Sequence, residues 1–258
     1  MADNGVFSSS SCIILETVDS TNAYLKKWMA REVLKEGTVV VARQQTAGRG
    51  QMGTSWESQP GKNLTFSMVL YPLFLPFAES FLISQLVALG IKDVLDGYTN
   101  DITVKWPNDI YWQDKKLAGI LVENAVQGDK FQSAVAGIGL NVNQEKFYSN
   151  APNPVSLKQI TGTTVELEDL LPQLISSILH YYDLIREEEK RLVVRQLYLQ
   201  SLYRKNGYHQ YSDAIGDFNA RIFDVEKNGH ITLEDEAGNL RRYGFKEIQV
   251  FPSTVILP

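Results

Sequence analysis

The sequence predicts an α+β fold in which a mixed, largely antiparallel sheet is packed with helices and followed by a small C-terminal β-barrel. Short β-branched runs alternate with segments of helical periodicity up to residue 139. A long amphipathic stretch then covers residues 168–203, and the remainder consists of short β-rich pieces separated by glycine-containing turns. We therefore expect a large unit over residues 1–206 and a small one over residues 207–258.

Each expected element follows from the spacing of apolar residues. Asp19 or Ser20 can cap a helix whose apolar positions continue to Val33. Pro107 ends a strand, because proline lacks a backbone donor and forces the preceding residue to be extended. The stretch of residues 168–203 is one long helix or two. The other expected elements are strands at 38–42, 63–70, 102–106, 110–112, 116–125 and 131–139, a helix at 77–95, and barrel strands at 219–225, 230–234 and 240–251.

Composition and charge argue against several classes of protein. Lysine and arginine total 25 against 30 aspartates and glutamates, a net charge of −5, so we expect no nucleic-acid binding. A single cysteine, Cys12, forms neither an intramolecular disulfide nor a thiolate cluster, which favours a reducing compartment, the cytoplasm. Residues 1–11 lack the apolar run of a secretion signal, and the apolar runs elsewhere are too short to span a bilayer, so we expect no membrane partner.

A glycine-rich segment carries the first chemical signal. Gly48, Gly50 and Gly53 let the backbone fold tightly and aim its N–H groups at anionic oxygens. Arg49 can pair with a phosphate or carboxylate, and Trp56 can stack on an adenine ring. The segment matches neither the Walker A loop nor the dinucleotide fingerprint. A flexible surface turn with a packed tryptophan is the alternative reading of this segment alone.

Two further motifs end or begin strands. Pro107 presents Asn108 and Asp109 together, and an amide beside a carboxylate suits a magnesium ion or an attacking amine, although an ordinary turn has the same composition. Lys116 precedes small and aliphatic residues, so its ammonium can point into a partly apolar pocket and stabilise negative charge. Gly119 would let a ligand approach the backbone closely. A hairpin with solvated lysines is the alternative.

A fourth motif ends the next strand, and the order of all four is specific. Asn141, after Gly137 and Gly139, can bind an adenine edge, a ribose or a phosphate, or hydrogen-bond its own turn. Taken together over residues 16–143, the motifs resemble the biotin protein ligase family, in its monofunctional type without an N-terminal DNA-binding domain. They are Ser20-Thr21-Asn22, Gln45 with Gly48-Arg49-Gly50, Lys105-Trp106-Pro107-Asn108-Asp109, Lys116-Leu117-Ala118-Gly119-Ile120-Leu121 and Gly137-Ile138-Gly139-Leu140-Asn141.

The resemblance implies a role for each of these residues. The ureido ring of biotin has one carbonyl acceptor and two N–H donors, and polar side chains of both kinds satisfy them. The implied biotin-binding residues are Ser20, Thr21, Asn22, Gln45, Gly48, Arg49, Gly50, Gln51, Lys116 and Gly119. The implied ATP-binding residues are Arg49, Gln51, Trp56, Lys105, Asn108 and Asn141. The implied catalytic residues are Lys116, Arg49 and Asp109, and the implied Mg²⁺ ligands are Asn108 and Asp109.

By the same resemblance the protein is expected to be an ATP-dependent ligase that forms biotinyl-5'-AMP and transfers biotin to a lysine of a biotin carboxyl carrier protein. A class II synthetase-like catalytic domain would bind biotin, ATP and Mg²⁺, an SH3-like barrel would follow, and the protein would be a monomer or weak homodimer. Many members of the family carry a second arginine where this chain has Gln51. Arg49 and Lys116 are therefore expected to carry more of the charge that retains the adenylate.

Three other functions fit parts of the pattern. A lipoate or octanoate ligase shares the architecture and a lysine in a similar place, but its acyl chain has no ureido group and does not need the polar set of Ser20, Thr21, Asn22 and Gln45. A biotin-responsive repressor needs a DNA-binding domain, whereas about 19 residues precede Ser20. A non-catalytic binding module would not need to retain Arg49, Asp109 and Lys116.

Overall fold

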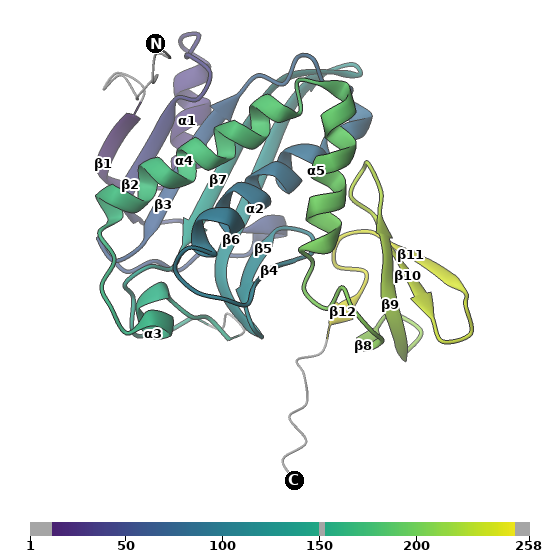
Figure 1. Cartoon of the computed structure of the whole chain (residues 1–258). Coiled ribbons are helices and arrows are strands. Elements are labelled where there is room, and N and C mark those ends of the chain that lie inside the picture. The colour runs from purple at the N-terminus through teal and green to yellow at the C-terminus, as the bar shows by residue number, and fades with distance from the viewer. Residues whose placement is uncertain (1–11, 150–152, 251–258) are drawn as a thin grey trace, which may run out of the picture.

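The computed structural model describes residues 12–149 and 153–250 and contains two sheets (Figure 1). The larger sheet has the strand order β1-β2-β3-β7-β6-β5-β4, in which β1 and β2 are parallel and the other neighbours antiparallel. Its strands are β1 (Cys12–Val18), β2 (Val39–Gln45), β3 (Leu64–Leu70), β4 (Ile102–Lys105), β5 (Asp109–Trp112), β6 (Lys115–Gln127) and β7 (Lys130–Leu140). The helices are α1 (Thr21–Met29), α2 (Phe81–Leu95), α3 (Leu157–Thr161), α4 (Leu167–Leu184) and α5 (Glu188–Gln200), with short 3₁₀ turns η1 (Gln51–Gly53) and η2 (Phe77–Glu79).

Helices cover both faces of the larger sheet. Successive side chains of a strand point to opposite faces, and Val39 and Val41 of β2 belong to the main core with α2 and α4, seen in front of the sheet in Figure 1. Val40 lies on the other face, where it packs with Leu25 of α1 and Val135 of β7. The residues of β7 that do not point into the main core, such as Val135, therefore face α1.

A second, wholly antiparallel sheet follows α5, with the order β11-β10-β9-β8-β12. Its strands are β8 (His209–Ser212), β9 (Asp217–Val225), β10 (Ile231–Asp235), β11 (Leu240–Tyr243) and β12 (Gln249–Val250). Trp106, at the end of β4, anchors it: the indole Nε1 donates to the carbonyl of Gly229 at 2.9 Å, and the ring packs 5.5 Å from that of Phe245. Lys227 also pairs with Glu79 of η2 at 2.8 Å.

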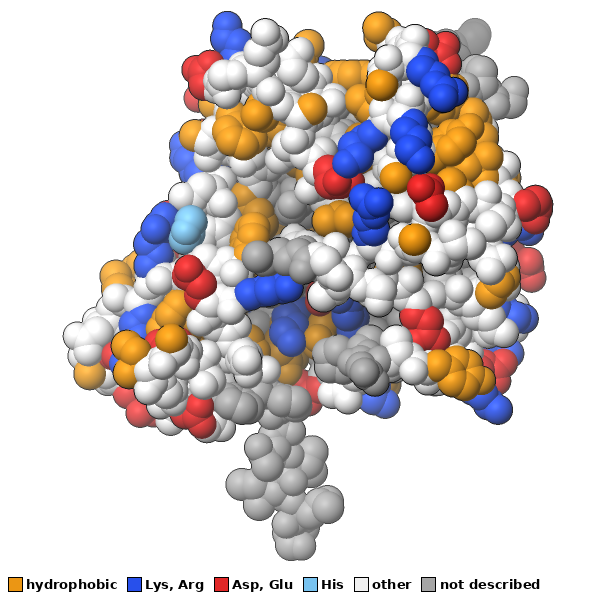
Figure 2. Space-filling view, turned by 180° about the vertical axis from the view of Figure 1, so that it is seen from behind, with side chains coloured by type: hydrophobic (Ala, Val, Ile, Leu, Met, Phe, Trp, Pro, Cys, Tyr) orange, Lys and Arg blue, Asp and Glu red, His pale blue; other side chains and the backbone are white. Residues whose placement is uncertain are grey.

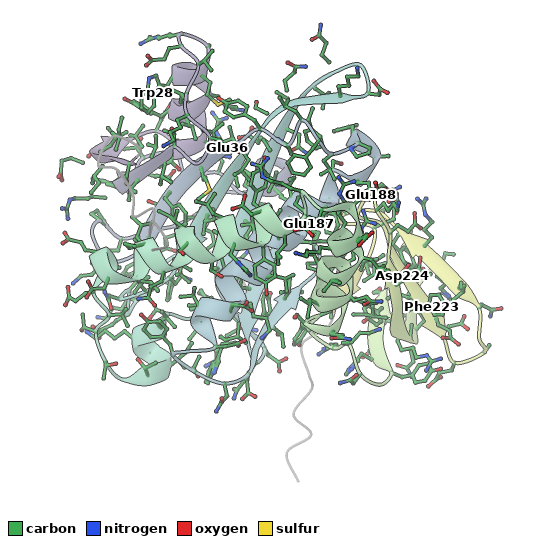
Figure 3. All side chains as sticks on the ribbon, turned by 45° about the horizontal axis from the view of Figure 1, so that its top comes forward. Trp28, Glu36, Glu187, Glu188, Phe223 and Asp224 are labelled. Carbon is green, nitrogen blue, oxygen red and sulfur yellow. The ribbon has the colours of Figure 1, made fainter. Side chains whose placement is uncertain are left out.

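The α+β expectation is confirmed, and so are the hairpin of β5 and β6 and its pairing with β7. The stretch of residues 168–203 forms two helices, and Figure 3 shows Glu187 and Glu188 where α4 gives way to α5. The second sheet lies within the expected small unit of residues 207–258, but the division of the chain at residue 206 stays a prediction. No helix in the described ranges is long and apolar enough to cross a membrane.

Several expected boundaries were wrong. The first helix ends at Met29, so Val33 lies in the loop beyond it and is almost fully exposed. The expected strand at 240–251 is interrupted, because Gly244 to Glu247 form a turn, and Phe251 lies outside the described residues. Strands β1 and β8 were not expected, since their mixed sequences show neither helical nor strand periodicity. Residues 1–11, on which the expectation of no secretion signal rests, lie outside the described residues as well.

We predict that Gly90→Ala destabilises the protein although alanine favours helices. Gly90 of α2 faces the backbone of α4, and a β-carbon there would lie 2.8 Å from Ile178 Cα. The two helices would have to separate, at a cost of about 1–3 kcal/mol in the free energy of unfolding. Urea unfolding measures this loss. Ser84→Ala, at a half-buried site on the same helix, is the control, and equal stability of the two variants would contradict the close approach.

Candidate active site

A cavity of about 260 Å³ opens on the α1 face of the larger sheet, where the motifs of the sequence meet. Figure 2 shows Lys and Arg side chains gathered around a hollow near the middle of the face opposite to that of Figure 1. The expected residues that line the cavity are Ser20, Thr21, Asn22, Gln45, Arg49, Gly50, Gln51, Trp56, Asn108, Asp109, Lys116 and Gly119. Of the other expected residues, Gly48, Lys105 and Asn141 do not line it.

Buried polar groups at the start of α1 form one end of the cavity. Ser20 caps the helix, and its hydroxyl accepts from the backbone N–H of Ala23 at 3.5 Å. The backbone N–H of Thr21 donates to Gln45 Oε1 at 2.8 Å, which joins α1 to the end of β2. The side chain of Asn22 lies against β7, where a β-carbon on Gly137 would lie 2.2 Å from Asn22 Oδ1. Glycine is therefore required at 137 for Asn22 to lie there.

The glycine-rich segment folds back on itself beside the cavity. The backbone N–H of Gly50 donates to the carbonyl of Thr54 at 2.6 Å, and that of Trp56 donates to the carbonyl of Gly48 at 3.0 Å. A β-carbon on Gly48 would lie 2.6 Å from the carbonyl oxygen of Trp56. Gly48 thus shapes the segment without lining the cavity, and Arg49 lies at the cavity wall.

Two oppositely charged side chains meet at the other end of the cavity. Lys116 Nζ lies 2.7 Å from Asp109 Oδ1, and each side chain keeps about a fifth of its surface exposed. The ammonium also lies 5.7 Å from the ring centre of Trp56. Lys105 lies elsewhere: its Nζ donates to Tyr111 Oη at 3.1 Å, and burial lowers the pKa of its ammonium. Of the two lysines, only Lys116 is placed to meet an anion in the cavity.

The indole of Trp56 lies across two glycines that face each other on β6 and β7. A β-carbon on Gly139 would lie 2.3 Å from Trp56 Cε2, and one on Gly119 3.0 Å from Trp56 Cζ3. Trp56 Nε1 is buried without a hydrogen-bond partner, and so is Asn141 Oδ1. Asn141 lines a neighbouring cavity of about 430 Å³ together with Trp56 and Lys116. Buried polar atoms without partners point to a ligand that supplies them.

Sequence reasoning missed three residues of the site. Lys246 lines the cavity from the turn between β11 and β12, where its φ of 67° is unusual for a side-chain-bearing residue. Ser67 of β3 and Glu123 of β6 bond to the side chain of Asn22 from below and beside it. Glu123 is only two residues beyond the motif that ends at Leu121, whereas Ser67 and Lys246 lie outside the motifs and are brought there by the pairing of strands and the docking of the second sheet.

The donor set for a metal ion is small. Within the described residues no group of three or more His, Cys, Asp or Glu side chains is arranged to bind a metal. Asn108 donates from its side-chain nitrogen to the carbonyl of Ile120, which leaves its amide oxygen, and Asp109 is paired with Lys116. One carboxylate and one amide oxygen fit a Mg²⁺ ion that takes its remaining ligands from phosphates and water.

Comparison with known proteins agrees with this geometry. Residues 14–141 match the model of the biotin/lipoate A/B protein ligase family. The chain is 34% identical over 168 residues to the biotin–[acetyl-CoA-carboxylase] ligase of Paracoccus denitrificans, covering 62% of this chain and 68% of that protein. This chain belongs to the biotin/lipoate A/B protein ligase family.

Other relatives and a solved structure extend the match. The bifunctional ligase/repressor BirA of Bacillus spizizenii is 32% identical over 169 residues, which cover 63% of this chain and 51% of the relative. The chain thus spans about half the length of the BirA relatives it matches. The biotin protein ligase of Aquifex aeolicus, solved with biotin and ATP, superposes with a TM-score of 0.77 at 26% identity, over 94% of this chain and 99% of that one.

We predict that Gly139→Ala moves the indole of Trp56. The added β-carbon would overlap the ring, so the ring would shift toward solvent and its fluorescence emission to longer wavelength. The emission spectrum of the variant, compared with that of the unmodified protein, measures this shift. In a Trp56→Phe background the substitution should change nothing, and an equal shift there would show that another tryptophan responds.

Proposed function

We propose that the protein is a biotin protein ligase that forms biotinyl-5'-AMP from biotin and ATP and transfers biotin to a lysine of a biotin carboxyl carrier protein. One observation carries the proposal: a single cavity is lined both by hydrogen-bonding side chains from the start of α1 and by the cations Arg49 and Lys116. The first group suits a ureido ring, and the second suits a carboxylate beside a triphosphate. The Aquifex aeolicus ligase, solved with both substrates, supports the same pairing.

The first half-reaction needs positioning and charge rather than a protein nucleophile. The carboxylate of biotin attacks the α-phosphorus of ATP in line, and pyrophosphate leaves with the electrons of the broken P–O bond. Arg49 and Lys116 offset the charge that the two anions bring together. Asn108 and Asp109 would hold Mg²⁺, which offsets triphosphate charge when bound.

Asp109 is the proposed positioning group or base of the second half-reaction. Its carboxylate forms an ion pair with Lys116, so the two side chains together carry little net charge. When the ammonium of Lys116 turns to the substrate, the carboxylate becomes available to the incoming amine. It can then orient or deprotonate the carrier lysine that attacks the acyl carbon and displaces AMP.

The glycine-rich segment is proposed to cover the adenylate. Residues 48–57 lie along the cavity, and Trp56 sits over the glycines at its floor. Movement of the segment over bound biotinyl-AMP would keep water from the mixed anhydride. Gln51 lines the cavity where many relatives have arginine, so Arg49, Lys116 and Lys246 supply the positive charge that faces it.

A lipoate or octanoate ligase is the alternative within the same family. The polar chain formed by Thr21, Asn22, Gln45 and their partners argues against it, because an alkyl chain or dithiolane would leave buried polar groups without partners. Incubation with ATP, a carrier domain and either biotin or lipoate, followed by mass measurement of the carrier, tests the assignment. Addition of biotin is expected, and addition of lipoate in preference to biotin would overturn it.

Several further expectations remain proposals. They are the division into residues 1–206 and 207–258, a monomer or weak homodimer, the absence of nucleic-acid and membrane partners, and a cytoplasmic location. The acidic composition, with a net charge of −5, supports the expectation that this chain does not bind nucleic acid.

We predict that Lys116→Ala lowers the rate of biotin-dependent ATP–pyrophosphate exchange by at least about 100-fold, because it removes charge stabilisation from the transition state. Lys115→Ala is the matched control, since Lys115 is exposed and does not line the cavity. Exchange close to that of the unmodified protein in Lys116→Ala would remove this side chain from the mechanism.

We predict that Asp109→Asn slows transfer more than adenylation. Asparagine keeps the shape of the side chain but accepts no proton, so the attack of the carrier lysine suffers most. Single-turnover transfer from preformed biotinyl-AMP to a carrier domain measures the second step, and pyrophosphate exchange measures the first. Equal losses in both steps would argue against a base role and for a purely structural pairing with Lys116.

A further inference from the structure

A chain of hydrogen bonds runs beneath the α1 end of the cavity and connects two sheet strands to the helix. Glu123 Oε2 on β6 accepts from Asn22 Nδ2 at 2.8 Å. Asn22 Oδ1 lies 2.5 Å from the hydroxyl of Ser67 on β3, and that hydroxyl lies 2.7 Å from Thr21 Oγ1. Thr21, Asn22 and Ser67 are all buried, so water does not compete for these contacts.

The carboxylate of Glu123 fixes which way the amide of Asn22 faces. Burial raises the pKa of Glu123, but hydrogen bonds from Lys26 and Asn22 outweigh it and leave the pKa below its usual value. The group is therefore ionised at neutral pH and only accepts hydrogen bonds. Asn22 must turn its nitrogen toward Glu123, and the same nitrogen donates to the carbonyl of Leu121 at 3.3 Å. Both amide hydrogens are then used, and the amide oxygen is left for Ser67.

The direction of the hydrogen bonds of Ser67 and Thr21 follows from the single hydrogen that each hydroxyl carries. Asn22 Oδ1 has no hydrogen, so the single hydroxyl hydrogen of Ser67 goes to it. Ser67 is then an acceptor toward Thr21. The hydroxyl hydrogen of Thr21 has two protein acceptors, Ser67 Oγ at 2.7 Å and Gln45 Oε1 at 3.2 Å. In either case the hydrogen of Thr21 points into the protein and a lone pair of its oxygen faces the cavity.

We propose that Glu123 is a positioning residue that sets the direction of this chain, so that Thr21 accepts a hydrogen bond from an N–H group of the substrate. The proposal rests on the proposed function, because the ureido ring of biotin supplies such a group. A dithiolane or alkyl chain has no N–H to offer. Glu123 thus favours the binding of biotin over that of a dithiolane or alkyl chain without contacting the substrate.

The opposite direction becomes available when the carboxylate is replaced by an amide. Glutamine at 123 can offer nitrogen as well as oxygen, so only the longer contact with the carbonyl of Leu121, at 3.3 Å, still holds the amide, and Asn22 can turn over and donate to Ser67. Ser67 would then donate to Thr21, so the hydroxyl hydrogen of Thr21 would lose its nearer acceptor, as it also would in Ser67→Ala, and could turn toward the cavity in place of a lone pair. The ion pair of Glu123 with Lys26, at 2.6 Å, uses the other carboxylate oxygen and lies half exposed, so it is not part of this chain.

The test compares Glu123→Gln, Ser67→Ala and Lys26→Met with the unmodified protein. Calorimetry measures the Kd for biotin, and pyrophosphate exchange measures the KM for ATP. Glu123→Gln and Ser67→Ala are each expected to weaken biotin binding about tenfold, the effect of one neutral hydrogen bond, with the ATP KM within about twofold. Lys26→Met keeps the carboxylate and is expected to bind biotin within about twofold of the unmodified protein.

The double variant Glu123→Gln/Ser67→Ala distinguishes a chain from two separate contacts. Because Glu123 acts through Ser67, the double variant is expected to bind biotin no more weakly than Ser67→Ala alone. Additive losses, a biotin Kd of Glu123→Gln unchanged from that of the unmodified protein, or an equal rise in the ATP KM would each overturn the proposal. If the unmodified protein does not bind biotin, the proposed function falls with it, whereas unchanged variants of an active ligase overturn the role of Glu123 alone.

Discussion

The register of three neighbouring strands determines where the site can form. Asp109 of β5 lies opposite Gly119 of β6, and Gly119 lies opposite Gly139 of β7. Two positions without side chains thus stand beside a carboxylate in one row across the sheet. Because side chains on a strand alternate between faces, a shift of one residue would turn both glycines toward the main core and close the floor. The cavity exists because these strands pair in this register.

The charged side chains that line the cavity come from separate segments of the chain. Asp109 and Lys116 come from neighbouring strands and neutralise each other, whereas Arg49 belongs to a loop and Lys246 to the second sheet. Under the proposed function, the two bound anions would offset the mutual repulsion of these cations.

The sequence predicts the central strands well because their residues are strongly periodic and glycine or proline marks their ends. Most of the cavity-lining residues within motifs were predicted for the same reason, since each motif stands at the end or the start of a strand or helix beside the cavity. Lys105 was expected there too, and its pairing with Asp109 puts it on the cavity's face of the sheet, yet its ammonium is held on Tyr111 and does not line the cavity. Ser67 and Glu123 lie inside ordinary strand sequences, and only three-dimensional pairing shows that they support Asn22.

The contact between Trp106 and the second sheet joins the two parts of the molecule next to the cavity. The indole is bound to the carbonyl of Gly229 and packed on Phe245, and Pro107, Asn108 and Asp109 follow it directly. Any movement of the C-terminal sheet would therefore also move the segment that carries the carboxylate of Asp109. The smaller sheet thus supports the position of Asp109 and is not independent of the larger one. Its removal would free the segment that carries Asp109 and would also remove Lys246 from the cavity wall.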